Sequence, residues 1–180
     1  MKRQKKTLAI VYNSVFIVIS LILGLIGKIS IFPIFPFLTL DFSDIPVFLA
    51  TLISGSTSGF VVLFVVSALR AITFSSAGWI GFIIRLTSMV IIFGLEIFWR
   101  KQFNKFYKIF GIVISVILCL TIKLIINYCL WINMFGISKD LLNGLMLSVI
   151  IPYNVAKIII TLTFSLLLEK PIKNVIDMTE

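Results

Sequence analysis

Hydrophobic residues follow one another in long runs, and short segments rich in Gly, Pro, Ser or charged residues separate these runs. A helix needs about 20 apolar residues to cross the hydrocarbon core of a bilayer, within a range of roughly 17–25. The runs predict an all-α integral membrane protein with six transmembrane helices, built as a single transmembrane domain over residues 1–180. The expected helices cover residues 8–26, 45–54, 60–73, 79–99, 109–135 and 145–168, of which the second and third are short.

The connection between the first two helices is expected to be a loop over residues 29–44. Pro33 and Pro36 prevent a regular helix there, because proline lacks an N–H and restricts the residue before it. Asp44 suits the N-cap of the next helix, and the proline two residues later suits its first turn. We interpret residues 55–59, which are rich in Gly and Ser, as a turn.

Composition supports a membrane protein and excludes other classes. Hydrophobic residues make up 60% of the chain and charged residues 13%, and the mean hydropathy is +1.18. A soluble domain is nearer about half apolar and about a quarter charged. The chain is therefore neither a soluble globular domain, a disordered segment nor a secreted disulfide scaffold. We also expect the first apolar run to stay in the protein, because it is too long for a signal peptide and no small-residue cleavage site follows it.

Residues that carry much of enzyme chemistry are missing. There is no His, which excludes Ser-His-Asp triads and His-ligated zinc. Cys119 and Cys129 lack the spacing of a metal or redox pair, and the chain has no P-loop motif for ATP. The net charge of +9 could suggest nucleic acid, but the cations cluster at the ends of apolar runs. We predict no catalytic residue, no metal ion, no cofactor and no nucleic-acid partner.

The distribution of Lys and Arg predicts the orientation in the membrane. With both termini cytoplasmic, six helices place ten cations inside and two outside, as the positive-inside rule requires. The outside pair is Lys28 and Lys139. We therefore predict a multi-pass membrane protein with both termini in the cytoplasm. The inside cations are Lys2, Arg3, Lys5, Lys6, Arg100, Lys101, Lys105, Lys108, Lys170 and Lys173.

Four further cations lie within the predicted spans, in or near the half that faces the outside. Each costs at least about 2.5–3.5 kcal/mol at the centre of a bilayer, so each should face protein or water. Asn127 lies four residues after Lys123, and Asn154 lies three residues before Lys157, so each asparagine shares a helix face with a lysine. The pattern predicts a polar cavity open to the outside. The four cations are Arg70, Arg85, Lys123 and Lys157.

Two alternatives to a cavity stay open. Arg70 could snorkel to the outer interface. Lys123 and Lys157 could instead pair with Asp41 or Asp44, if the loop that carries these acids folds inward. Because the spans carry no acid at the depth of the four cations, we expect the cations to meet an electron-rich or anionic ligand.

Three segments of the chain resemble those of a known family. The segments Phe35–Pro46, Asn127-Tyr128 and Ile151–Lys157 are similar to those of riboflavin-type S components. S components are the substrate-binding subunits of energy-coupling factor (ECF) vitamin transporters, and the similarity covers most of the chain. The resemblance implies the ECF S-component fold, with six helices and cytoplasmic termini, in a bacterial cytoplasmic membrane. It also implies a vitamin pocket on the outer side, with the loop over residues 29–44 as its lid.

The resemblance also implies partners and ligand contacts. A transmembrane T subunit and two ATPase subunits would power uptake, which agrees with the missing P-loop. Asn127, Asn154 and Lys157 would contact the ligand, and Leu40 with its neighbour Asp41 would line the lid. Small residues of the first helix would dock the T subunit, because they allow helices to approach closely. We name Ala9, Asn13 and Ser14 for this role.

Two departures leave the substrate open. Riboflavin-type members usually carry a Lys-Asn pair in the third helix, where this chain has Val66-Ser67, with Arg70 further on. Arg85 and Lys123 are additional cations. They would suit a carboxylate-bearing vitamin such as pantothenate, and a pyrimidine or a pyridoxine precursor also fits. Other functions are a small intramembrane enzyme that acts on a phosphorylated lipid, or a structural membrane protein.

Overall fold

A computed structural model describes residues 2–27, 29–30, 39–73, 78–100, 104–135 and 139–177. Most of the expected lid loop, including the Phe-Pro part of the motif, lies outside these residues, as do Lys28 and Lys101. The helices are α1 (Lys2–Ile26), α2 (Ile45–Ser54), α3 (Ser56–Thr73), α4 (Gly78–Leu86), α5 (Met89–Gly94), α6 (Lys105–Phe135), α7 (Lys139–Leu145) and α8 (Ile151–Asp177). Two π-helical stretches, η1 (Leu95–Arg100) and η2 (Met146–Ile150), continue α5 and precede α8.

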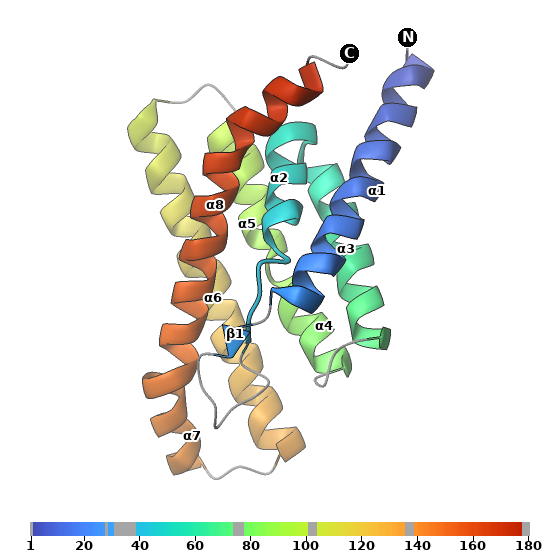
Figure 1. Ribbon diagram of the computed structural model, residues 1–180. Coiled ribbons are helices and arrows are strands. Elements are labelled where there is room, and N and C mark those ends of the chain that lie inside the picture. The colour runs from blue at the N-terminus through green and yellow to red at the C-terminus, as the bar shows by residue number, and fades with distance from the viewer. Residues whose placement is uncertain are drawn as a thin grey trace.

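These elements form six helical segments, because α4, α5 and η1 follow one another as the fourth and α7, η2 and α8 as the sixth (Figure 1). Five stretches of the described chain are long and apolar enough to cross a membrane. Both chain ends lie at the same end of the bundle (Figure 1). The all-helical membrane fold is thus confirmed, while the assignment of this end to the cytoplasm stays a prediction.

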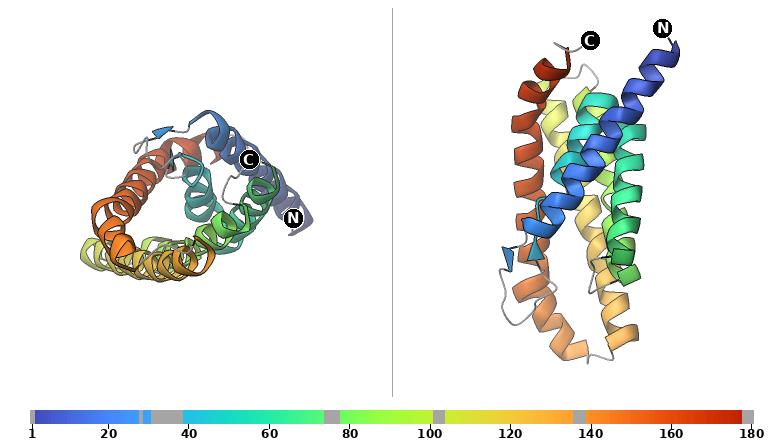
Figure 2. Two further views of the ribbon diagram at one scale, coloured as in Figure 1. Left: turned by 90° about the horizontal axis from the view of Figure 1, so that it is seen from below. Right: turned by 45° about the vertical axis from the view of Figure 1, so that its right-hand side comes forward.

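The short helix α2 lies at the centre of the fold. Seen along the bundle, the other helices surround it (Figure 2). It packs against α1, α3, α8 and η1, and every residue from Ile45 to Leu52 is buried. Its 10 residues extend only about 15 Å, too short to cross a bilayer alone. Because protein rather than lipid surrounds it, α2 supplies the apolar core on which the neighbouring helices pack.

The turn between α2 and α3 is shorter than the sequence suggests. Residues 55–59 were expected to form a turn, but only Gly55 lies outside the two helices, with a φ of 104° that suits glycine. Helix α3 begins at Ser56, whose backbone N–H donates to Oε2 of Glu96 at 2.9 Å. Gly59 serves close packing instead, since a Cβ there would lie 1.9 Å from Oγ1 of Thr51. The expectation was wrong because a distant carboxylate satisfies the first turn.

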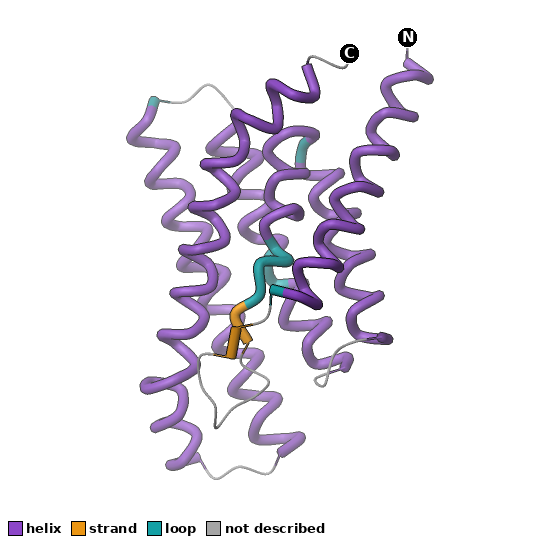
Figure 3. Tube along the Cα trace, in the orientation of Figure 1, coloured by secondary structure: helices purple, strands orange, loops and turns teal. Residues whose placement is uncertain are grey.

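A pair of two-residue strands brings the chain from α1 to the centre of the bundle. Strand β1 (Ile29–Ser30) pairs antiparallel with β2 (Thr39–Leu40). After β2 the chain runs as a loop between the helices and enters α2 at Ile45 (Figure 3). Asp44 occupies the expected N-cap position of α2, but its side chain makes no capping hydrogen bond. Its carboxylate instead forms ion pairs with Arg85 and Lys157.

Candidate substrate site

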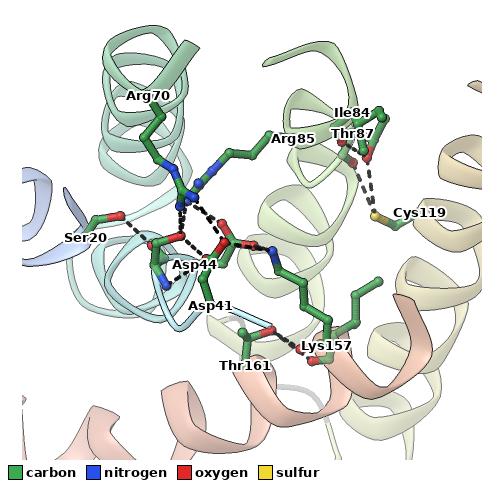
Figure 4. Close-up of polar contacts among 12 residues, drawn as sticks. Ser20, Asp41, Asp44, Arg70, Ile84, Arg85, Thr87, Cys119, Lys157 and Thr161 are labelled. Carbon is green, nitrogen blue, oxygen red and sulfur yellow. Dashed lines mark hydrogen bonds and ion pairs between the residues drawn. The ribbon is translucent and has the colours of Figure 1, made fainter. Parts of the chain in front are cut away.

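The loop between β2 and α2 carries two buried carboxylates into the bundle. Asp41 and Asp44 are each 4% exposed, and Ser43 between them is fully buried. The side chains of Arg70 and Arg85 reach this loop from α3 and α4, and Lys157 reaches it from α8 (Figure 4). Three helices therefore send one cation each to a short stretch of loop.

Ion pairs join these groups directly. Nη2 of Arg70 lies 3.2 Å from Oδ2 of Asp41, and Nη2 of Arg85 lies 2.6 Å from Oδ1 of Asp44. Nζ of Lys157 lies 3.4 Å from Oδ2 of Asp41 and 3.8 Å from Oδ2 of Asp44. We call these five side chains, together with Ser43, the ionic cluster. Each carboxylate thus meets two of the three cations, which offsets the cost of burying it.

The surrounding charges keep both carboxylates ionised. Burial raises the pKa of Asp41, but Lys157, Arg85 and Arg70 outweigh it and hold the pKa of this carboxyl well below its usual range. Burial likewise raises the pKa of Asp44, and Arg85 and Lys157 bring about a net lowering. Both aspartates therefore act as anions in the folded protein.

The pairing corrects two expectations. The sequence suggested that no acid lies at the depth of the intramembrane cations, yet Asp41 and Asp44 fold inward and pair with three of them. The alternative that Arg70 snorkels to the interface is also wrong, because its guanidinium binds the loop. The pairing alternative holds for Lys157, and not for Lys123. The sequence does not show this pairing because it depends on the tertiary structure, in which the loop before α2 enters the bundle instead of staying outside it.

Lys123 differs from the other three cations. It is 5% exposed, and its ammonium makes no hydrogen bond or ion pair with any residue that the structure describes. It is close enough to Asp44, Lys157 and Arg85 to interact with them electrostatically. One buried cation, Lys123, and three half-buried ones thus face two carboxylates, an excess of two positive charges in this part of the described chain. A ligand with electron-rich oxygen or nitrogen atoms would complement this excess.

Two buried asparagines lie one helical turn from the lysines. Asn127 on α6 donates from Nδ2 to the carbonyl of Lys123 at 2.8 Å, and Asn154 on α8 donates in the same way to Ile150 at 2.8 Å. They are 8% and 5% exposed. A carbonyl can only accept, so each amide must direct its nitrogen to the backbone. Each Oδ1 is left as an acceptor, and no donor from the described residues occupies it.

Comparison with known proteins identifies the family. The family described as the substrate-specific component of ECF transporters matches residues 8–169. The chain belongs to this family. The riboflavin transporter RibU of Staphylococcus aureus (strain TCH60) is 31% identical over 143 residues, which cover 75% of each chain. A solved structure of the S component of a bacterial ECF transporter superposes with a TM-score of 0.75 and 26% identity, covering 95% of this chain and 98% of that one.

Membership settles the broad function. As an S component, the chain is a substrate-binding subunit of a membrane transporter and not an enzyme. The alternative of an enzyme that acts on a phosphorylated lipid is therefore excluded. Its fold is the S-component fold, and it lies in the cell membrane as a multi-pass protein.

The structure also locates the residues named for docking the T subunit. Ala9 and Asn13 are half-buried on the stripe of α1 that continues through Phe16 and Ser20, both of which face the protein interior. Ser14 is exposed and donates to the carbonyl of Ile10 at 2.9 Å. The three residues therefore do not share one outward face, and their role in docking stays a prediction.

Sequence reasoning missed the residues that connect the charges. Ser43 and Ser20 carry no charge and belong to no motif, yet Ser43 contacts Asp41 and both arginines, and Ser20 donates to the backbone carbonyl of Ser43. The one available signal is the position of Ser43 between two aspartates, and that signal alone indicates a turn.

Proposed function

We propose that this S component captures a water-soluble vitamin of the riboflavin type. We further propose that it delivers the vitamin through a T subunit and two ATPase subunits. The relative at 31% identity is a riboflavin transporter, which supports this substrate class. The observation that carries the proposal is the ammonium of Lys123, which has no partner among the described residues, beside asparagines whose Oδ1 atoms accept from none of these residues either.

The donor and acceptor pattern fits the flat ring system of such a vitamin. The pyrimidine part of an isoalloxazine carries an imide N–H between two carbonyl oxygens. The Oδ1 of Asn127 or Asn154 would accept from the N–H, and the ammonium of Lys123 would donate to a carbonyl. Lys157 would add a second cation while the aspartates hold it. Leu40, which is 5% exposed at the end of β2, would contribute apolar contact from the loop.

A carboxylate-bearing vitamin is the second candidate. The excess of two positive charges favours it, because a single carboxylate would offset half of that excess. Pantothenate is the example to test, and pyrimidine and pyridoxine precursors complete the panel. Riboflavin is preferred because the relative at 31% identity is a riboflavin transporter, and because the imide N–H of the flavin ring suits the oriented amide acceptors.

The experiment is mass spectrometry of small molecules that co-purify with the detergent-solubilised protein, followed by calorimetric titration with the panel. We expect a bound flavin and one-to-one binding of riboflavin. Saturable binding of pantothenate alone would overturn the riboflavin assignment. A folded protein that binds no member of the panel would overturn the vitamin-binding proposal.

Delivery needs a separate test. Co-expression with a T subunit and two ATPases should give a stable complex and ATP-dependent uptake of the bound vitamin into vesicles. Uptake that continues when the ATPases carry inactivated P-loops would contradict the proposed partners.

A further inference from the structure

The loop residue Ser43 is the point at which two arginines meet. Its hydroxyl donates to Oδ1 of Asp41 and accepts from Nη1 of Arg70 at 2.5 Å and from Nη2 of Arg85 at 2.8 Å. A serine hydroxyl offers one donor and two acceptor sites, so these three contacts use its full capacity. Directed hydrogen bonds of the Ser43 hydroxyl, in addition to the attraction between charges, therefore fix the positions of the two guanidinium groups.

The same loop is fastened on further sides. The two arginines also bind the aspartates on either side of Ser43, at 3.2 Å for Arg70 with Asp41 and 2.6 Å for Arg85 with Asp44. Ser20 of α1 donates to the backbone carbonyl of Ser43. Helices α1, α3 and α4 thus hold the loop, and α8 reaches it through Lys157 (Figure 4).

Helix α1 is shaped to admit the guanidinium of Arg70. A Cβ at Gly24 would lie 2.7 Å from Nη1 and 3.0 Å from Cζ of Arg70. Gly24 is helical, so its backbone does not require glycine. The small residue is explained by the space that the arginine occupies.

We infer that Arg70 and Arg85 are positioning residues, which fix β2 and the loop that follows it to Asp44, through Ser43 and the two aspartates. They thereby preorganise Leu40 and Lys157 for the ligand. The inference rests on the proposed function, because Leu40 and Lys157 are the ligand contacts proposed above. Fixing the loop before binding removes the cost of ordering it when the ligand arrives.

The first test measures the loop without ligand. Hydrogen exchange of the backbone amides from residue 39 to residue 54 is followed by mass spectrometry in Arg70→Gln, Arg85→Gln and the wild-type protein. We expect faster exchange in this segment for both variants, with α6 unchanged. Unchanged exchange in the loop would overturn the inference. This readout does not depend on which vitamin binds, so a failed riboflavin titration affects only the proposed function.

The second test uses Gly24→Ala, which adds one methyl group and removes no polar atom. Alanine normally favours a helix, but here it should displace Arg70 and weaken riboflavin binding about tenfold, the scale of one lost hydrogen bond to a charged group. Gly144→Ala in α7 is the matched control, since a Cβ at Gly144 meets nothing within 4 Å. The control should bind like the wild type.

A double variant decides whether Gly24 acts through Arg70. If it does, Gly24→Ala combined with Arg70→Gln should bind no more weakly than Arg70→Gln alone. Additive losses would overturn this link. Arg70→Lys gives a further check, and it also serves if Arg70→Gln fails to fold. One ammonium cannot reproduce the two nitrogens that bind Ser43 and Asp41, so we expect partial recovery of affinity. Full recovery would contradict the geometric role of the guanidinium.

Discussion

The carboxylates of the ionic cluster differ from those of η1 and the last part of α8 in the contacts that the structure describes. Asp41 and Asp44 are buried among three cations. Glu96 accepts from the backbone N–H of Ser56, and Glu169 accepts from the indole Nε1 of Trp99 at 2.8 Å. Those two contacts join η1 to α3 and to the part of α8 near the C-terminus (Figure 1).

This difference in partners distinguishes contacts that hold the fold together from a candidate ligand-binding site. A neutral N–H donor can close a helix end or join two helices, as the contacts of Glu96 with Ser56 and of Glu169 with Trp99 do. The ionic cluster carries charges whose burial is costly, together with a further lysine that has no partner among the described residues. Fold stability alone does not require such an excess of positive charge, so we attribute it to ligand binding.

Removing one carboxylate of the ionic cluster should have the largest effect on stability. Asp44→Asn leaves the guanidinium of Arg85, whose side chain is 11% exposed, without its closest anion, at 2.6 Å in the wild type. Breaking such a pair costs about 3–5 kcal/mol. Thermal unfolding in detergent, followed by labelling of the buried thiol of Cys119, measures the loss. A loss below about 1 kcal/mol, the scale of an exposed ion pair, would contradict the structural importance of this pair.

Lys157→Ala should act mainly on the ligand. Asp41 keeps Arg70 and Asp44 keeps Arg85, so we expect the protein to stay folded. Removing a half-buried charge from a binding site should weaken vitamin binding by at least about tenfold. Calorimetry together with the unfolding temperature separates the two effects. Unchanged affinity would refute the placement of Lys157 at the ligand.

Glu169→Gln should have a small effect. The Oε1 of glutamine can still accept from the indole N–H of Trp99, so we expect a change of about 0.5 kcal/mol or less. The same unfolding assay applies, and Asp44→Asn is its matched comparison. A loss as large as that of Asp44→Asn would show that charge matters equally in both regions.

The pH dependence should be the smallest effect near neutrality. Both aspartates have a lowered pKa in the folded protein, so their stabilising contribution is complete above the ordinary carboxyl pKa of about 3.9. It is lost only as the pH falls below that value towards the lower pKa of the folded state. Unfolding temperatures measured from pH 8 to pH 3 should show no decrease from these groups above about pH 5. A decrease between pH 7 and pH 5 that Asp44→Asn abolishes would contradict this account.

The sequence predicted the fold class because each membrane-spanning helix requires a long run of apolar residues, which the sequence shows directly. It also predicted that buried cations mark the informative region, since a charge within a span needs a reason to be there. The family resemblance correctly added the S-component fold and the transport function. The roles of the individual site residues stay predictions.

Local sequence could not give the pairing of the charges. Asp44 stands where a helix start is expected and Asp41 stands in the loop before it, and only the packing of four helices around this loop turns their carboxylates inward. Gly24 and Ser43 are similar cases. Their importance comes from the side chain of Arg70, which is 46 residues away from Gly24 and 27 from Ser43 and reaches them only in the folded chain.

Equilibrium titration of riboflavin into the purified protein, followed by quenching of flavin fluorescence, tests the central claim most directly. The matched variant is Asn154→Leu, which removes the oriented acceptor and keeps a side chain of similar size. We predict saturable one-to-one binding to the wild-type protein and a loss of at least about tenfold in the variant. Equal affinities would contradict the proposed role of the amide, and a folded wild-type protein that does not bind riboflavin would contradict the proposed substrate.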